Sequence, residues 1–101
     1  MDLRQLRNFI HIVDLSSITA ASERLGVAQP ALSRQVKALE ADLGVELLRR
    51  HGRGVTPTKE GIRLARRAQS ILDDVDDLAE DLSGNRRAPS GTIALGLPPT
   101  V

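Results

Sequence analysis

Residues 20–35 read AASERLGVAQPALSRQ, and this stretch decides the fold. A short, alanine-rich helix is expected from about residue 19 to residue 25, and it ends at Gly26 because glycine commonly follows a helix. A new helix begins at Gln29-Pro30, since proline is tolerated in the first helical turn, where its missing N–H has no helical partner. The pattern therefore predicts two helices joined by a short turn, the arrangement called a helix-turn-helix.

The second of these helices has one apolar face and one polar face. The apolar residues recur at spacings of four, three and four, and they are Leu32, Val36, Leu39 and Leu43. Gly44 ends the helix. At about 100° per residue, the opposite arc carries Gln29, Pro30, Ser33, Arg34 and Lys37. Such a polar arc is usually only a solvated surface, so evidence for a binding role has to come from the neighbouring segments.

The residues on both sides predict two further helices and a hairpin. Apolar residues at spacings of three, four and three predict an amphipathic helix over residues 3–15, with Asp2 as its cap. Residues 46–57 predict a small β-hairpin whose tip holds two glycines and Arg53. Thr58 can cap a long fourth helix that runs to about Ser83.

The long helix carries a heptad-like apolar stripe that can pack on its own domain or on a second copy of the chain. The stripe consists of Ala65, Ala68, Leu72, Val75, Ala79 and Leu82, with Leu64, Ile71 and Leu78 alongside. We favour the second copy, because a helix of about 25 residues, rising about 1.5 Å per residue, is longer than the small core beneath it. The first helix assists, so the expected homodimer interface consists of Leu3, Leu6, Ala68, Leu72, Val75, Leu78, Ala79 and Leu82.

The last residues have the pattern of a domain boundary. Residues 85–91 include Pro89 and predict a hinge, and residues 92–101 begin with the apolar–polar alternation of a strand. A single strand without a partner is not stable. We therefore expect a fragment composed of a domain at 1–58, a linker helix at 59–84, the hinge, and the first strand of a missing second domain.

The net charge argues against a nucleic-acid partner only when it is averaged over the chain. The 14 Lys and Arg residues against 13 Asp and Glu residues give a formal net charge of +1. Basic side chains outnumber acidic ones over residues 1–57, whereas acidic side chains outnumber basic ones over residues 58–85. The first part therefore has the basic excess that a duplex-binding protein normally shows.

Several classes of function are excluded by composition. The chain has no cysteine, which rules out disulfides and thiolate metal sites and favours a reducing compartment, the cytoplasm. No apolar run approaches the roughly 20 residues of a membrane span. Phe9 is the single aromatic residue, which argues against recognition of single strands by stacking. His11 and His51 lack neighbouring ligands at a metal spacing, so we expect no enzyme, no metal and no cofactor.

A helix-turn-helix can place its second helix in the major groove of duplex DNA, and this gives the polar arc a purpose. Arg34 is suited to guanine and Gln29 to adenine, while Ser33 can serve a base or a phosphate. Lys37 is better suited to a phosphate. Arg53 at the hairpin tip is suited to an adjacent minor groove.

The start of the first helix of the pair is suited to a phosphate. Free N–H groups at a helix start attract anions, and Thr19 adds a hydroxyl there.

Four segments together resemble the winged helix-turn-helix of LysR-type transcriptional regulators. They are residues 20–35, Leu39-Glu40 through Gly44-Val45, Arg53-Gly54-Val55 followed by Thr56-Pro57-Thr58, and Ser90-Gly91-Thr92-Ile93. The resemblance covers nearly the whole chain in the same order. It implies a mainly α fold, with three helices and a two-stranded wing followed by a long linker helix that pairs with its twin in a dimer.

The same resemblance implies partners for the longer protein. A domain similar to periplasmic binding proteins follows in the family and takes a small-molecule effector, and the full-length protein is expected to be a tetramer. The segments Ala28-Gln29-Pro30 and Val55-Thr56-Pro57-Thr58 further resemble the branch that contains nitrogen-assimilation regulators.

Two positions depart from the family pattern. Many members have Ser or Thr at the position of Ala28, where the hydroxyl caps the recognition helix and touches a phosphate; its loss typically costs about 1 kcal/mol. Many also have Phe at the position of Leu48, so the anchor beneath the wing is smaller here.

The sequence thus predicts a sequence-specific, double-stranded DNA-binding module that acts as a symmetric dimer on a two-fold-related site. The candidate DNA-binding residues are Thr19, Ala28, Gln29, Pro30, Ser33, Arg34, Lys37, Arg50 and Arg53. The alternative is a dimerisation or protein-interaction module on the same scaffold that reads no DNA. The arginines at both expected contact points, Arg34 and Arg53, argue against that alternative.

Overall fold

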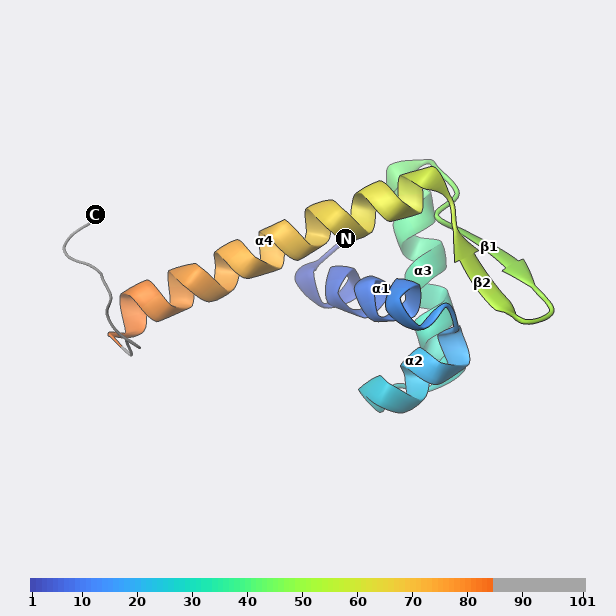
Figure 1. The fold of residues 1–101 in the computed structure, drawn as a ribbon, viewed down its shortest axis with the longest axis horizontal. Coiled ribbons are helices and arrows are strands. Elements are labelled where there is room, and N and C mark those ends of the chain that lie inside the picture. The colour runs from blue at the N-terminus through green and yellow to red at the C-terminus, as the bar shows by residue number, and fades with distance from the viewer. Residues whose placement is uncertain (85–101) are drawn as a thin grey trace.

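Four helices and one β-hairpin make up residues 1–84, the part of the chain that the computed structural model describes (Figure 1). In chain order they are α1 (Leu3–Leu15), α2 (Ile18–Leu25), α3 (Gln29–Leu43), β1 (Leu48–His51), β2 (Gly54–Pro57) and α4 (Lys59–Ser83). This architecture confirms the predicted fold class. The predicted hinge at 85–91 and strand at 92–101 lie outside the described residues.

Two of the predicted helix caps are confirmed. The Asp2 carboxylate accepts a hydrogen bond from the N–H of Gln5 at 2.8 Å, and the Gln5 side chain accepts one from the N–H of Asp2 at 3.0 Å. At the start of α4, Thr58 Oγ1 accepts from the N–H of Gly61 at 3.0 Å. Each cap satisfies a backbone donor that the helix itself leaves without a partner.

The turn between α1 and α2 differs in detail from the prediction. Ser16 ends α1 in the left-handed conformation, with φ at 54°. Ser17 Oγ then accepts from the N–H of Ala20 at 3.0 Å, so that Ser17 is the cap of α2. The helix consequently begins at Ile18, one residue before the predicted start at about Thr19.

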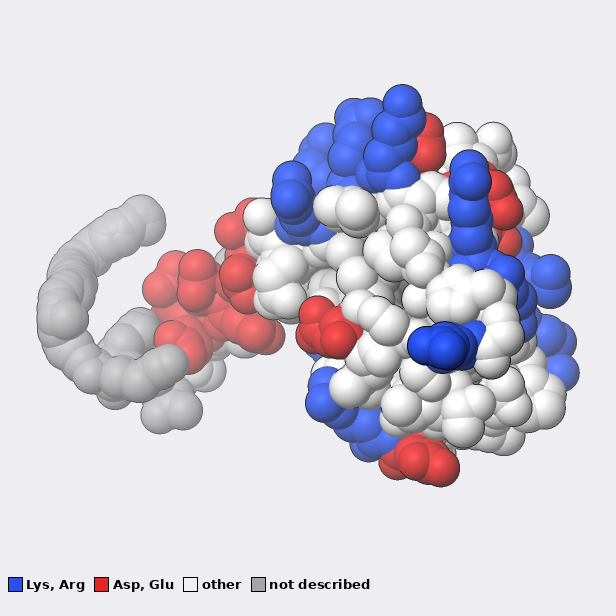
Figure 2. Space-filling view, turned by 45° about the vertical axis from the view of Figure 1, so that its right-hand side comes forward, with Lys and Arg blue, Asp and Glu red and all other residues white. Residues whose placement is uncertain are grey.

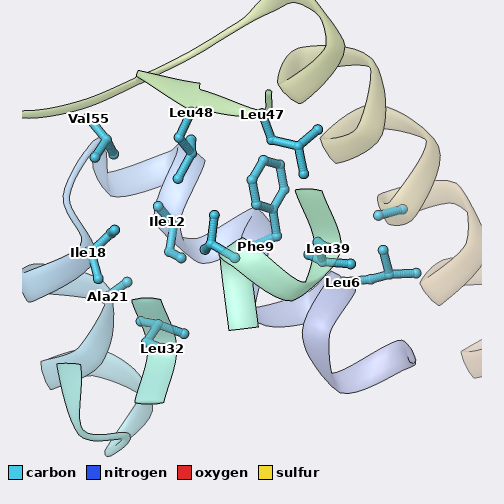
Figure 3. Close-up of a cluster of buried hydrophobic side chains, with 12 residues drawn as sticks. Leu6, Phe9, Ile12, Ile18, Ala21, Leu32, Leu39, Leu47, Leu48 and Val55 are labelled. Carbon is cyan, nitrogen blue, oxygen red and sulfur yellow. The ribbon is translucent and has the colours of Figure 1, made fainter. Parts of the chain in front are cut away.

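The core lies where α1, α2, α3 and the hairpin meet (Figure 3). Its largest fully buried side chains are Phe9, Ile12, Leu32, Leu39 and Leu47. Burying a side chain of this size stabilises a fold by about 1.5–3 kcal/mol. The apolar stripe predicted for α3 therefore forms one wall of the core, although its last member, Leu43, is 40% exposed.

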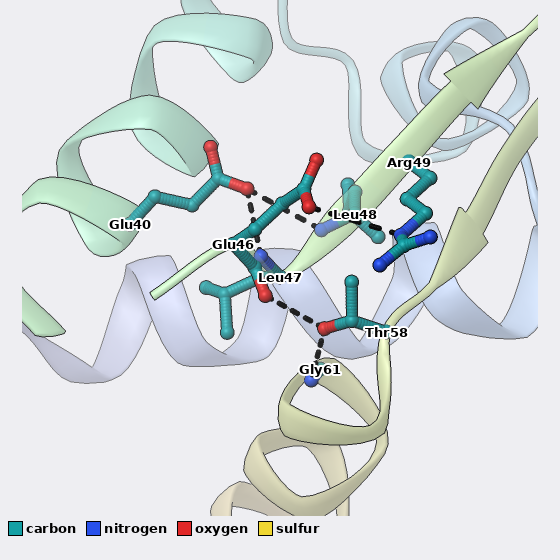
Figure 4. A network of polar contacts seen from close by, with 7 residues as sticks. All are labelled: Glu40, Glu46, Leu47, Leu48, Arg49, Thr58 and Gly61. Atoms are coloured by element: carbon teal, nitrogen blue, oxygen red, sulfur yellow. Dashed lines mark hydrogen bonds and ion pairs between the residues drawn. The ribbon is translucent and has the colours of Figure 1, made fainter. Parts of the chain in front are cut away.

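A glutamate on α3 holds the start of the hairpin (Figure 4). Oε2 of Glu40 accepts from the N–H of Leu47 at 2.8 Å and from the N–H of Leu48 at 3.3 Å. Both of these residues have buried side chains, and Leu48 is the predicted anchor beneath the wing. The carboxylate thus satisfies two backbone donors at the point where the chain enters β1.

The start of α4 lies unusually close to the same segment. The Thr58 hydroxyl donates to the carbonyl of Glu46 at 2.7 Å, and the N–H of Thr58 donates to the carbonyl of Leu47 at 2.9 Å. A Cβ on Gly61 would overlap the carbonyl oxygen of Leu47. Glycine at this position therefore permits the close approach that sets the direction of α4.

Only the first half of α4 packs on the rest of the molecule. Gly61, Ala68 and Leu72 are buried, whereas none of residues 73–83 is. Figure 1 shows this second half extending away from the other elements. At about 1.5 Å per residue, a helix of 25 residues is about 37 Å long, which is more than the underlying core can cover.

Candidate nucleic-acid interface

The N-terminal half of α3 presents the predicted polar arc to solvent. Gln29, Pro30, Arg34 and Lys37 are exposed, and Ser33 is half-buried. The alternation with buried Leu32 and Val36 follows from the helical period, which turns polar and apolar positions to opposite sides. The side chains predicted to read bases therefore share one accessible surface.

The start of α3 has no side-chain cap. Ala28 occupies the capping position in an extended conformation, with φ at −60° and ψ at 137°, and makes no side-chain hydrogen bond. Pro30 lies in the first turn, as predicted. Because no cap hydroxyl covers the first N–H groups, this exposed helix start is suited to accept an anion such as a phosphate.

The hairpin contributes two arginines to the same region. Arg50 is exposed on β1, and its Nη2 donates to Ser33 Oγ on α3 at 3.5 Å. Arg53 is exposed in the turn between β1 and β2. The structure thus joins the hairpin to the polar arc through Arg50 and Ser33, an adjacency that the sequence alone does not give.

The hairpin is also fixed to the turn between α1 and α2. The N–H of Val55 donates to the carbonyl of Ser16 at 3.1 Å. Gly54 has a φ of 140°, and a Cβ there would overlap the same Ser16 carbonyl. Glycine is therefore required for this contact, which ties β2 to the entry of α2.

Thr19, the remaining DNA-binding prediction, is exposed near the start of α2. Ser17, which caps α2, was not among the residues predicted from the sequence. Its residue type was the available signal, because a serine three residues before Ala20 is a typical helix cap.

Positive and negative side chains are separated along the molecule. Figure 2 shows acidic residues gathered on the extended part of α4, whereas the body carries most of the basic residues together with a few acidic ones. The acidic residues beyond Leu72 on this helix are Asp73, Asp74, Asp76, Asp77, Glu80 and Asp81. The second half of α4 would repel phosphates, so a nucleic acid is favoured only at the body.

The residues predicted for the dimer interface fall into two groups. Three of them are buried within the single chain, namely Leu6 at 5%, Ala68 at 0% and Leu72 at 6% exposure. The others are exposed, namely Leu3, Val75, Leu78, Ala79 and Leu82. The stripe on α4 therefore serves its own core up to Leu72 and remains uncovered beyond it, so the second group alone is available to a partner.

A groove of about 240 Å³ runs between α1 and α4 beside this uncovered stripe. Ile10 and Leu72 line it together with charged side chains of both signs, including Arg7, Asp14 and Asp76.

Two other features are absent from residues 1–84. No three His, Asp or Glu side chains of this part gather closely enough to hold a metal ion. None of its helices is long and apolar enough to cross a membrane.

Known proteins resemble this chain over most of its length. Residues 3–62 match the family described as bacterial regulatory helix-turn-helix protein, lysR family. The nitrogen assimilation regulatory protein nac of Escherichia coli (strain K12) is 42% identical over 99 residues, which are 98% of this chain. That stretch is 32% of the relative, so the chain spans about a third of its length.

Two solved structures of similar chains contain DNA. A CbnR_DBD–DNA complex superposes with a TM-score of 0.81 at 39% identity, covering 84% of this chain and 98% of that chain. A complex of BenM_DBD with benA site 1 DNA superposes with a TM-score of 0.79 at 40% identity, covering 85% of this chain and all of that chain. BenM is an HTH-type transcriptional regulator of Acinetobacter baylyi.

Proposed function

Because the chain belongs to the lysR family of bacterial regulatory helix-turn-helix proteins, we propose that residues 1–84 bind double-stranded DNA with sequence specificity as one half of a homodimeric transcriptional regulator. The recognition helix is α3, which enters the major groove, and the hairpin is a wing that reaches the adjacent minor groove. The regulator acts in the cytoplasm, where bacterial DNA is accessible.

One observation carries this proposal: the hydrogen bond from Arg50 to Ser33 makes the wing and the polar arc of α3 one surface. Arg34 and Arg53, the predicted contacts to the two grooves, are both exposed on these elements. Exposed arginines at both places where a winged helix-turn-helix meets DNA favour DNA binding over the alternative of a protein-interaction module.

Each side chain of this surface has a distinct role. Arg34 and Gln29 read base edges, because their side chains form paired hydrogen bonds with guanine and adenine. Lys37, Arg50 and the hydroxyl of Thr19 contact phosphates and set the register without reading sequence.

The probe for the first experiment is a DNA duplex that the protein selects by binding from a pool of random sequences. We expect Arg34→Ala to weaken binding of the selected duplex by about tenfold to a hundredfold and to relax the preference at one base pair. Lys37→Ala should weaken the binding of all duplexes to the same extent, and it should lower the magnitude of the slope of log affinity against log salt concentration by about one.

Arg24→Ala is the charge-matched control for both variants. Arg24 is exposed in the last turn of α2, at the end of that helix away from Thr19. The proposal is wrong if the chain fails to bind duplex DNA at low salt, or if Arg34→Ala behaves like Arg24→Ala.

The homodimer is proposed on the uncovered half of α4. Val75, Leu78 and Leu82 are 36%, 57% and 79% exposed on one helix, and the groove against α1 adjoins them. Charge favours an antiparallel pair, because the first half of α4 carries Lys59, Arg63, Arg66 and Arg67 and the second half carries the acidic residues. In that arrangement each basic half lies beside the partner's acidic half.

Sedimentation tests the dimer. Leu78→Asp with Leu82→Asp places charges on the uncovered stripe without touching the core, and we expect it to halve the sedimenting mass. Leu72 is unsuitable for this test, since it is buried in its own chain and its replacement would unfold the protein. Ser70→Asp is the control, because Ser70 is exposed away from the stripe. An unchanged mass for the double variant contradicts the proposed interface.

The rest of the longer protein is proposed from the family. We infer an effector-binding domain after residue 91 and a tetramer in the full-length protein, with DNA sites related by two-fold symmetry. Selection from a random duplex pool tests the symmetry directly, because a dimer should enrich two inverted half-sites at fixed spacing.

A further inference from the structure

His51 makes two hydrogen bonds at the tip of the wing. Its Nε2 lies 2.9 Å from Thr56 Oγ1, and its Nδ1 lies 3.3 Å from the backbone nitrogen of Arg53. A backbone N–H can only donate, so Nδ1 must be the acceptor. The neutral ring then carries its proton on Nε2 and donates it to the Thr56 hydroxyl, which fixes the tautomer of the imidazole.

The strand register explains why the ring can make both bonds. His51 pairs with Gly54 across the hairpin, and Thr56 lies two residues further along β2. Residues two apart in a strand share a face, so the ring and Thr56 are diagonal neighbours within reach of each other. His51 and Thr56 are both exposed, whereas Val55 points into the core.

The bond to Arg53 has the connectivity of an Asx-turn. In such turns the side chain of one residue accepts from the N–H two residues later and so orders the turn. Gly52 lies between His51 and Arg53, and glycine gives this turn the widest conformational freedom. The ring therefore restrains the backbone from which the Arg53 side chain starts.

We propose that His51 is a positioning residue that orders the wing turn so that Arg53 points into the minor groove. The inference rests on the proposed function, because it gives Arg53 its target. His51 acts through Arg53 and not by its own contact with DNA. Thr56 completes the arrangement, because its hydroxyl oxygen accepts the hydrogen bond from Nε2–H and holds the ring in place.

A double-mutant cycle on the affinity for the selected duplex tests this directly. We expect His51→Leu to weaken binding by about twofold to tenfold, the range of one neutral hydrogen bond. In the Arg53→Ala background the same substitution should have no further effect. Thr56→Val should give a smaller loss that also disappears without Arg53.

His51→Asn is the rescue variant, because the asparagine oxygen can accept from the N–H two residues later as the ring does. It should restore most of the affinity that His51→Leu loses. A ¹⁵N spectrum of the neutral imidazole in the 101-residue chain gives an independent readout of the tautomer, in which the single ring proton should lie on Nε2 and not on Nδ1.

The possible failures are distinguishable. An equal loss from His51→Leu with and without Arg53 overturns the inference and indicates direct contact of the ring with DNA. If Arg53→Ala loses affinity for the duplex and His51→Leu does not, the inference about His51 is also overturned, but the proposed function remains intact. If Arg53→Ala itself has no effect, the proposed minor-groove contact is wrong, and the inference falls with it.

Discussion

Replacing Glu40 should destabilise the protein more than any other single change to an acidic side chain in residues 1–84. Its Oε2 atom accepts from the N–H groups of Leu47 and Leu48 at 2.8 and 3.3 Å, and those side chains are 1% and 5% exposed. Glu40→Ala removes two charge-assisted hydrogen bonds and leaves two donors in a buried segment.

The expected loss follows from these contacts. A hydrogen bond to a charged group contributes about 1.5–3 kcal/mol, and the second, longer bond contributes less, so Glu40→Ala should lower the free energy of unfolding by about 3 kcal/mol. For a domain of this size, that lowers Tm by about 12–24 °C. Because both bonds end on one oxygen, Glu40→Gln can keep them without the charge and should lose only about 1 kcal/mol.

Urea unfolding of the 101-residue chain at one fixed protein concentration gives the measurement, since association would shift the midpoint. Glu46→Ala is the matched control, because Glu46 pairs with Arg49 at 3.7 Å with both side chains more than 60% exposed. That pair should contribute no more than about 0.5 kcal/mol. The reasoning is refuted if Glu40→Ala loses no more than Glu46→Ala, or if Glu40→Gln is as unstable as Glu40→Ala.

Three further predictions concern stability. Ala28→Ser should raise the free energy of unfolding by about 1 kcal/mol, because it supplies the cap that α3 lacks; an unchanged urea midpoint would contradict this. Gly61→Ala should lower the free energy of unfolding by more than about 2 kcal/mol, since the alanine Cβ would overlap the Leu47 carbonyl oxygen. A melting curve like that of the unchanged protein would contradict this and show that α4 can shift without penalty. The hydrogen bond and the charge of Asp42 raise the pKa of the Met1 ammonium group above 8.0, so its stabilisation is present below pH 8 and is lost as pH rises through the raised pKa. Asp42→Asn should therefore flatten the decline of stability at alkaline pH, and an unaltered pH curve would count against the pair.

The sequence predicted the local elements well because the interactions that define them are short in range. The apolar period of residues 29–43 placed Leu32, Val36 and Leu39 on one face, and all three are buried. Asp2 and Thr58 cap their helices through bonds to residues only three positions away. The start of α2 was predicted one residue too late, because Ser17, which caps this helix, was not identified as its cap from the sequence.

The long helix shows where periodicity stops being informative. Its heptad-like spacing continues from Ala65 to Leu82, but the core covers the stripe only as far as Leu72. A repeat identifies a face and says nothing about which neighbour covers it. The division between the part that packs in the chain and the part left for a partner is decided by where α1, the main neighbour of α4, ends in space.

By itself, then, the sequence determined the helix-turn-helix, the positions of the polar arc and the basic hairpin tip. The tertiary structure alone decided how the wing is held. Glu40 reaches Leu47 and Leu48 past the turn at Gly44, and Arg50 reaches Ser33 from another element. Such contacts depend on chain reversal and on packing between elements, so no spacing along the sequence encodes them. They are also the contacts that bring the two arginine-bearing elements into one surface.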